Sequence, residues 1–261
     1  MPNEAPRLPA DRLPEPRSVL VRMMLTPGRG AAVATEAAAP AGRPQYHILR
    51  TLEVDEYEAP VAPAEIMALA AARHAPADNT FRGTARKAAK LSIVNAATER
   101  FDDVSALIDT LPDDRTMADN ADITTDATND RVPEEKRNVR MPAFLYAASM
   151  ENDNDFHLII GRDPAKPPTY MTAEVSGLPP RNSASFATLN SARAAYLEFF
   201  ASGLPGATYD FYDPPIPIEI EGSLFWDASH AHGGRPGPSK LRPKMPVVWE
   251  IHPVTKITFE P

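Results

Sequence analysis

Three pairs of an acidic residue and a histidine occur in the C-terminal half of this chain. The pairs are Asp155 with His157, Asp227 with His230, and Glu250 with His252. Side chains two residues apart on a β-strand point to the same face, so the first and third pairs each place a carboxylate beside an imidazole. A carboxylate can fix the tautomer of a general-base histidine, and both groups can bind a divalent metal ion together.

A structural role is the alternative for each pair, because a histidine often only hydrogen-bonds a neighbouring acid. The recurrence of three pairs favours a shared site, and we expect a divalent metal ion to be its cofactor. The spacing fits no standard zinc motif, since His230 and His232 flank an alanine in a loop and do not lie four residues apart on a helix. The predicted metal ligands are Asp155, His157, Asp227, His230, Glu250 and His252.

A basic segment separates the second pair from the third. It contains no acidic residue between Asp227 and Glu250, and basic side chains of this kind suit a phosphate-bearing ligand. The predicted ligand-binding residues are His230, His232, Arg235, Lys240, Arg242 and Lys244. The acidic turn at 151–155 weakens the hypothesis of a simple nucleic-acid groove but could hold a cation beside the basic segment. The alternative is a solvated surface loop.

The elements that must position these residues follow from apolar periodicity. Alternation predicts strands at 138–150, 156–161, 169–177, 217–227 and 247–260, and apolar residues at spacings of three and four predict a helix at 183–203. This order predicts an α+β protein with a five-stranded OB-like β-barrel and one helix between strands 3 and 4. A short β-sandwich is the alternative. In OB folds, the loop between strands 4 and 5 and the loop between strands 1 and 2 bind oligonucleotides or oligosaccharides.

The N-terminal half has a different composition. Residues 1–45 are rich in proline and alanine and predict an extended or disordered arm, which is a candidate for binding a protein partner. Residues 46–112 predict a strand within 46–58 and helices at 64–74, 84–101 and 101–111. The acidic stretch 113–135 predicts a solvated linker and a domain boundary, so we expect residues 136–261 to fold alone.

Bulk properties exclude several classes of protein. The net charge of -8 argues against a basic protein that coats DNA, and the absence of cysteine excludes disulfides and thiolate metal sites. The chain shows no secretory signal pattern and no apolar run of about 20 residues. We therefore expect a cytoplasmic protein without a membrane span.

Three stretches carry a resemblance to a known group. DNDFHLII (153–160), GSLFWDASH (222–230) and WEIHPVTKI (249–257) together resemble a group of uncharacterised bacterial proteins over residues 137–261. The resemblance implies that the six predicted metal ligands belong to one constellation, and it implies no reaction.

Three functional hypotheses remain open at this point. The first is a binding domain for an anionic ligand, nucleic acid or a nucleotide, held by the basic segment. The second is a metal-dependent phosphodiester hydrolase that uses the histidine and carboxylate residues. The third is a structural domain that binds a partner protein.

Overall fold

The computed structural model describes residues 20–24, 45–54, 78–200, 203–230 and 235–259. The α-helices are α2 (Lys87–Lys90), α3 (Val104–Ile108), α4 (Asp114–Ala118) and α5 (Phe186–Phe199), and the 3-10 helices are η1 (Pro133–Glu135), η2 (Ala228–His230) and η3 (Arg242–Lys244). The strands are β1 (Leu20–Met24), β2 (Gln45–Arg50), β3 (Thr98–Arg100), β4 (Asn138–Met150), β5 (Phe156–Gly161), β6 (Tyr170–Val175), β7 (Asp210–Trp226) and β8 (Trp249–Phe259). The α+β class is confirmed.

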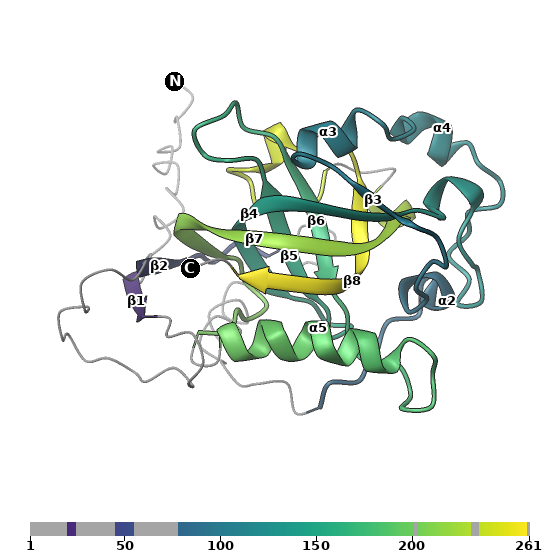
Figure 1. Ribbon diagram of the computed structural model, residues 1–261, viewed down its shortest axis with the longest axis horizontal. Coiled ribbons are helices and arrows are strands. Elements are labelled where there is room, and N and C mark those ends of the chain that lie inside the picture. The colour runs from purple at the N-terminus through teal and green to yellow at the C-terminus, as the bar shows by residue number, and fades with distance from the viewer. Residues whose placement is uncertain (1–19, 25–44, 55–77, 201–202, 231–234, 260–261) are drawn as a thin grey trace, which may run out of the picture.

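The described strands form one mixed sheet in the order β1-β2-β7-β8-β6-β5-β4-β3 (Figure 1). An additional pairing of β4 with β7 connects two strands that are distant in this order, so part of the sheet is ring-like. The strands of this ring are β4, β5, β6, β8 and β7. β6 and β8 are parallel, whereas the other pairs within the ring are antiparallel. The strands expected in the C-terminal half are therefore present, and β1, β2 and β3 extend the sheet.

The main core lies on one face of these strands, as alternation predicts. Phe156, Leu158 and Ile160 of β5 share a buried apolar cluster with Trp249 and Ile251 of β8. α5 packs along one side of the ring, and α3 and α4 lie on the opposite side (Figure 1). The expected helix at 183–203 is thus present and covers the core. Burying each large apolar side chain stabilises the fold by about 1.5–3 kcal/mol.

The other face of β5 and β6 is buried as well. Every residue of these two strands is buried, and a second apolar cluster on this face contains Ile159, Tyr170, Leu241 and Met245. A strand buried on both faces normally carries apolar residues throughout. His157 and Glu174 break this rule, and they mark the candidate site.

The prediction of a helix at 84–101 is wrong. The segment forms only the four-residue α2, an irregular stretch and strand β3. Residues distant in sequence form hydrogen bonds with the backbone of this segment. The Val94 N–H donates to Ser223 Oγ at 3.0 Å. The Asn138 side chain donates to the carbonyls of Val94 and Ala96 at 2.7 and 3.0 Å. These bonds replace the intrahelical bonds that the apolar spacing suggested. The helix expected at 101–111 is shortened to α3, which the Asp103 side chain caps.

The acidic stretch 113–135 is not the expected solvated linker. It contains α4 and η1, and Met117 and Val132 belong to the main core. Glu135 is fully buried and its carboxylate pairs with Arg86. The domain boundary placed here stays a prediction, but these contacts favour one folding unit.

The remaining N-terminal expectations are tested in part. β2 forms within the strand expected at 46–58, and β1, in the arm 1–45, pairs with it antiparallel. The helix expected at 64–74 lies outside the described residues. Among the helices described, none combines the length and the apolar character that crossing a membrane requires.

Candidate metal centre

Polar side chains gather on the face of β5, β6 and β8 that points away from the main core. β5 contributes His157, β6 contributes Glu174, and β8 contributes Glu250 and His252, all of them buried. Alternation places them there, because Trp249 and Ile251, on either side of Glu250, occupy the core. The sequence-based expectation of a same-face pair on β8 is therefore confirmed, although the pair is enclosed instead of lying on an open surface.

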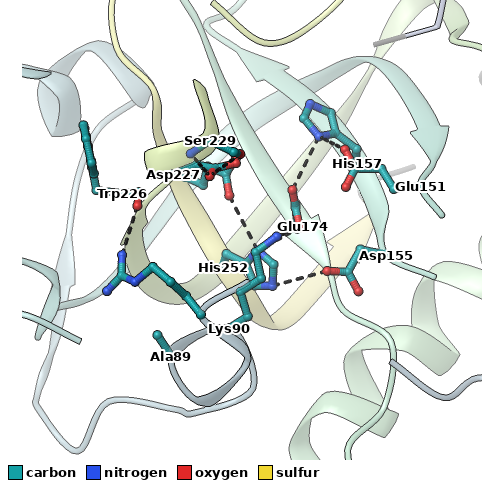
Figure 2. Close-up of polar contacts among 12 residues, drawn as sticks. Ala89, Lys90, Glu151, Asp155, His157, Glu174, Trp226, Asp227, Ser229 and His252 are labelled. Carbon is teal, nitrogen blue, oxygen red and sulfur yellow. Dashed lines mark hydrogen bonds and ion pairs between the residues drawn. The ribbon is translucent and has the colours of Figure 1, made fainter. Parts of the chain in front are cut away.

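Glu174 lies at the middle of this arrangement (Figure 2). Its Oε1 is 3.4 Å from Nδ1 of His157, and its Oε2 is 2.7 Å from Nδ1 of His252. Nδ1 of His157 is also 2.8 Å from Oε1 of Glu151. The carboxylate of Glu174 on β6 thus lies between two histidines, one from each of the strands that flank β6.

Asp155 approaches from the turn before β5. Asn154 enables this turn with a positive φ of 77°, and its side chain donates to the carbonyls of Asp78 and Thr80. Oδ1 of Asp155 accepts a 2.5 Å hydrogen bond from the Gly177 N–H, which leaves Oδ2 3.4 Å from Nε2 of His252. The acidic turn therefore directs one carboxylate inward.

A further group forms where β7 ends. Asp227 accepts hydrogen bonds from the backbone N–H and the hydroxyl of Ser229, at 2.9 and 2.6 Å, and lies 3.5 Å from Nε2 of His230. Ligand atoms of Asp227, His230 and Glu250 all lie within 4.8 Å of one another. Glu250 links this group to the strands, since its Oε2 is 3.5 Å from Nδ1 of His252.

Lys90 reaches the cluster from α2. Its Nζ lies 3.8 Å from Asp153 and 3.9 Å from Glu174. Arg131 fixes α2 over the strands, because its Nη2 donates to the carbonyls of Ala89 and His252, both at 2.7 Å. One guanidinium group thus joins the backbone of the residue before Lys90 to the backbone of His252 on β8.

Burial and mutual repulsion set the ionisation of the carboxyl groups. They raise the pKa of Asp155 and Glu250 well above the ordinary value, and burial with the charge of Glu174 raises the pKa of Glu151 to about 7. Burial also acts to raise the pKa of Glu174, but His252 and Lys90 outweigh it and hold that pKa well below the ordinary value. Burial also acts to raise the pKa of Asp227, but His230 and Lys90 outweigh it and lower that pKa. Glu174 and Asp227 are therefore carboxylates that keep their charge.

The basic groups respond to the same charges. Burial acts to lower the pKa of Lys90, but the carboxylates of Glu174, Asp227 and Asp153 outweigh this effect and raise it well above the ordinary value. The pKa of His157 is raised in the same way by Glu151 and Glu174, whereas burial lowers the pKa of His252. Lys90 is thus a permanent cation within the cluster.

The cluster contains more acids than cations. Its carboxyl groups belong to Glu151, Asp153, Asp155, Glu174, Asp227 and Glu250, and its basic groups belong to Lys90, His157, His230 and His252. Both carboxyl oxygens of Glu250 are buried and lack a hydrogen bond of normal geometry to any part of the chain that the structure describes. A buried polar atom without a partner costs about 1–3 kcal/mol, so this composition favours a bound cation.

Within the described residues, three groups have the geometry to hold a metal ion. They are Glu151, His157 and Glu174; Asp155, Glu174 and His252; and Asp227, His230 and Glu250. In each group, one ligand atom per residue lies within 4.8 Å of the others. All six predicted metal ligands therefore occur in these groups, spread over three sites that lie side by side.

The basic segment is less open than expected. Arg235 forms an ion pair with Asp114, and Arg242 donates to the carbonyl of Gly237. Lys240 is exposed and lies over the ring of Phe211, and Lys244 is exposed. His232 lies outside the described residues. Among the residues of the predicted anion site that the structure describes, Lys240 and Lys244 are exposed, and Arg235 and Arg242 are partly buried.

Sequence reasoning missed four members of the cluster. Glu174 could have been found as an acidic residue in an otherwise apolar strand opposite His157. Glu151 and Asp153 were recognised only as part of an acidic turn. Lys90 carried no signal, because it comes from a distant segment that was expected to be helical.

Comparisons with known proteins gave no relative. No model of a known protein family matches the chain, and searches of curated proteins and of solved structures found no match. The resemblance to a group of uncharacterised bacterial proteins stays a prediction, and functional conclusions rest on the geometry of the site.

Proposed function

We propose that this chain binds divalent metal ions in the histidine and carboxylate cluster and hydrolyses phosphodiesters with metal-bound water. The observation that carries the proposal is the set of three adjacent groups whose ligand atoms lie within 4.8 Å of one another. Carboxylate oxygens with one imidazole per group suit ions such as Mn²⁺, Mg²⁺ and Zn²⁺. A bound divalent ion lowers the pKa of its water and stabilises charge on a phosphoryl oxygen.

Internal ion pairs alone explain the cluster less well. Lys90 approaches Asp153 and Glu174, but it cannot neutralise Asp155 and Glu250, whose pKa values are raised well above the ordinary value by burial and neighbouring acids. Buried charged groups in proteins are normally paired with an opposite charge or coordinate a metal ion. A divalent ion would release these protons and satisfy the carboxylates.

The arrangement of strands supports a phosphodiester as the substrate. We infer that the ring β4-β5-β6-β8-β7 is an OB-like five-stranded barrel, with α5 as the helix between its third and fourth strands. In OB folds the face of strands 2 and 3 and the loops 1–2 and 4–5 bind oligonucleotides. The cluster occupies the corresponding places: β5, β6, the turn 151–155 and the connection from Asp227 to Glu250. This support is an analogy at the level of fold.

Binding of an anionic ligand without turnover is the second candidate. The observation that favours it is the exposure of Lys240 and Lys244 in a segment next to the cluster. Arg235 and Arg242 bind other groups of the chain, so the positive charge that this segment can offer to a ligand is smaller. The cytoplasmic location and a nucleic-acid partner stay predictions.

The test uses the full chain after treatment with EDTA and dialysis. Mn²⁺, Mg²⁺ and Zn²⁺ are added one at a time, and cleavage is measured on a fluorescent single-stranded oligonucleotide and on bis(p-nitrophenyl) phosphate. We expect metal-dependent cleavage that the substitution Glu250→Gln reduces by at least about tenfold. Glu198→Gln, an exposed position on α5, is the matched control.

Three results are informative. Cleavage that needs metal and Glu250 supports the proposal. Salt-sensitive oligonucleotide binding without cleavage by any metal form favours the second candidate. A chain that binds neither metal nor oligonucleotide contradicts both and leaves a structural role.

A further inference from the structure

A row of three side chains crosses the central strands of the cluster. His157 of β5 is the register partner of Glu174 on β6. On the other side of β6, Ala173 is the partner of Ile251, so Glu174 lies next to His252. Neighbouring strands are about 4.8 Å apart, so the side chain of Glu174 lies between those of His157 and His252. The space between Glu174 and His157 is called the first gap, and the space between Glu174 and His252 is called the second gap.

The two oxygens of Glu174 face different gaps. Oε1 lies 3.4 Å from Nδ1 of His157, which Glu151 also approaches, and Oε2 lies 2.7 Å from Nδ1 of His252. Asp155 approaches the other ring nitrogen of His252, Nε2, at 3.4 Å. On each side of Glu174, one histidine and one further carboxylate therefore lie within reach of one of its oxygens (Figure 2).

The polar atoms around His252 are buried and lie close together. Oδ2 of Asp155, Oε2 of Glu174 and both ring nitrogens of His252 are buried, and within the described ranges they make no hydrogen bond of normal geometry. The Oε2 atom of Glu250, equally buried, points at the same histidine from 3.5 Å. Ligand atoms of Asp155, Glu174 and His252 lie within 4.8 Å of one another, which is the spacing that a metal site needs before its ligands close on an ion.

We propose that Glu174 bridges two divalent metal ions, one held with Glu151 and His157 and the other with Asp155 and His252. Two ligands of one ion are at most about 4.2 Å apart, given metal–ligand distances of about 2.1 Å. The ligand atoms now lie within 4.8 Å, so side-chain shifts of roughly half an ångström close each site.

This inference rests on the proposed function and deepens it. Pairs of metal ions about 3.5–4 Å apart stabilise both the attacking and the leaving oxygen when a phosphodiester is displaced in line. The bridge would therefore place the reacting phosphate beside Glu174, with Lys90 close enough to neutralise its charge.

The test is electron paramagnetic resonance of the EDTA-treated full chain with added Mn²⁺, together with the number of bound ions from isothermal titration. We expect an exchange-coupled signal from a pair of ions in the wild-type chain. Glu174→Gln should abolish the coupled signal. His157→Gln and His252→Gln should each remove one ion of the pair and leave an uncoupled signal.

Thermal unfolding of each variant verifies that it is folded, and the two histidine variants preserve the test if Glu174→Gln does not fold. An ion bound by Asp227, His230 and Glu250 would add the same signal to each variant. Uncoupled ions whose number does not change in His157→Gln would overturn the bridge, and the proposed metal-dependent hydrolysis could still hold. A wild-type chain that binds no Mn²⁺ would overturn the bridge and also remove the basis of the proposed function.

Discussion

Replacing Glu135 with glutamine should destabilise the protein strongly, because this carboxylate joins the N-terminal half to the strand ring. It accepts hydrogen bonds from both terminal nitrogens of Arg86 at 2.7 Å and from the backbone N–H groups of Val132 and Trp226 at 2.9 Å. Both charged side chains are almost completely buried. The pair therefore has no water to replace a lost partner.

The magnitude follows from these contacts. Glutamine keeps one acceptor oxygen and replaces the other with an NH₂ donor, so two of the four donors lose their acceptor. Hydrogen bonds to a charged group contribute about 1.5–3 kcal/mol each, which gives a loss of about 3–6 kcal/mol. Measured costs of breaking a buried ion pair, about 3–5 kcal/mol, agree with this range because the Arg86 charge remains buried.

The assay is urea unfolding followed by tryptophan fluorescence. The chain has two tryptophans, Trp226 and Trp249, and both are buried in the main core. We expect Glu135→Gln to lower the free energy of unfolding by about 3–5 kcal/mol. The adjacent Glu134 is exposed, so Glu134→Gln should change it by less than about 0.5 kcal/mol. Equal stabilities of the two variants would refute the role assigned to the Arg86–Glu135 pair.

Other predictions concern the folding unit, the core and the metal centre. The fragment 136–261 should show no cooperative melting transition by circular dichroism, since it lacks Arg86 and the buried residues of 113–135; a sharp transition would support a separate C-terminal domain. Ile251→Val should cost about 0.5–1.5 kcal/mol in urea unfolding, as expected for a core position, and no loss would contradict its placement there. Lys90→Met should strengthen Mn²⁺ binding by about tenfold or more in calorimetry, because a unit positive charge about 4 Å from a divalent ion costs about 2 kcal/mol even at the dielectric constant of water. The control is Lys87→Met, an exposed change on the same helix that should leave the affinity for Mn²⁺ unaltered. Equal affinities of the two variants would argue against an ion near Lys90. Adding Mn²⁺ at 100 times its Kd to the EDTA-treated chain should stabilise it by about 2.7 kcal/mol per site, and an unchanged melting temperature would speak against the metal centre.

The sequence was informative where one local pattern decides the structure. Alternation identified the strands that became β5 and β8, and it correctly assigned Trp249 and Ile251 to the core. Spacings of three and four identified α5, whose Leu189 and Tyr196 are buried as expected. These elements follow the local rule because the core they face is large and apolar.

Local patterns failed where distant groups determine the backbone. The apolar spacing in 84–101 indicated a helix, but Ser223 and Asn138 bind the backbone of Val94 and Ala96 instead. The acidic composition of 113–135 predicted a solvent-exposed linker, whereas Glu135 is buried because Arg86 supplies its counter-charge. Neither partner is close in sequence.

The candidate site, like the fold, was predictable where it depends on local spacing and not where it depends on contacts between distant segments. Same-face pairs on strands could be read from spacing, and Asp155, His157, Glu250 and His252 do lie near one another. The central role of Glu174 depends on which strands are neighbours of β6, and this depends on the ring closure. Lys90 depends on where α2 is anchored, which no spacing encodes.

The closure of the strand ring also limits edge-to-edge association between copies of this protein. Within the ring, each strand has a neighbour on both sides, so its backbone groups are not available for pairing with another molecule. At one end of the strand order lies β3, which is only three residues long, exposed and charged at Glu99 and Arg100. Short charged edge strands resist edge-to-edge association. The strands that carry the candidate metal centre lie within the ring, away from the edge that β3 forms.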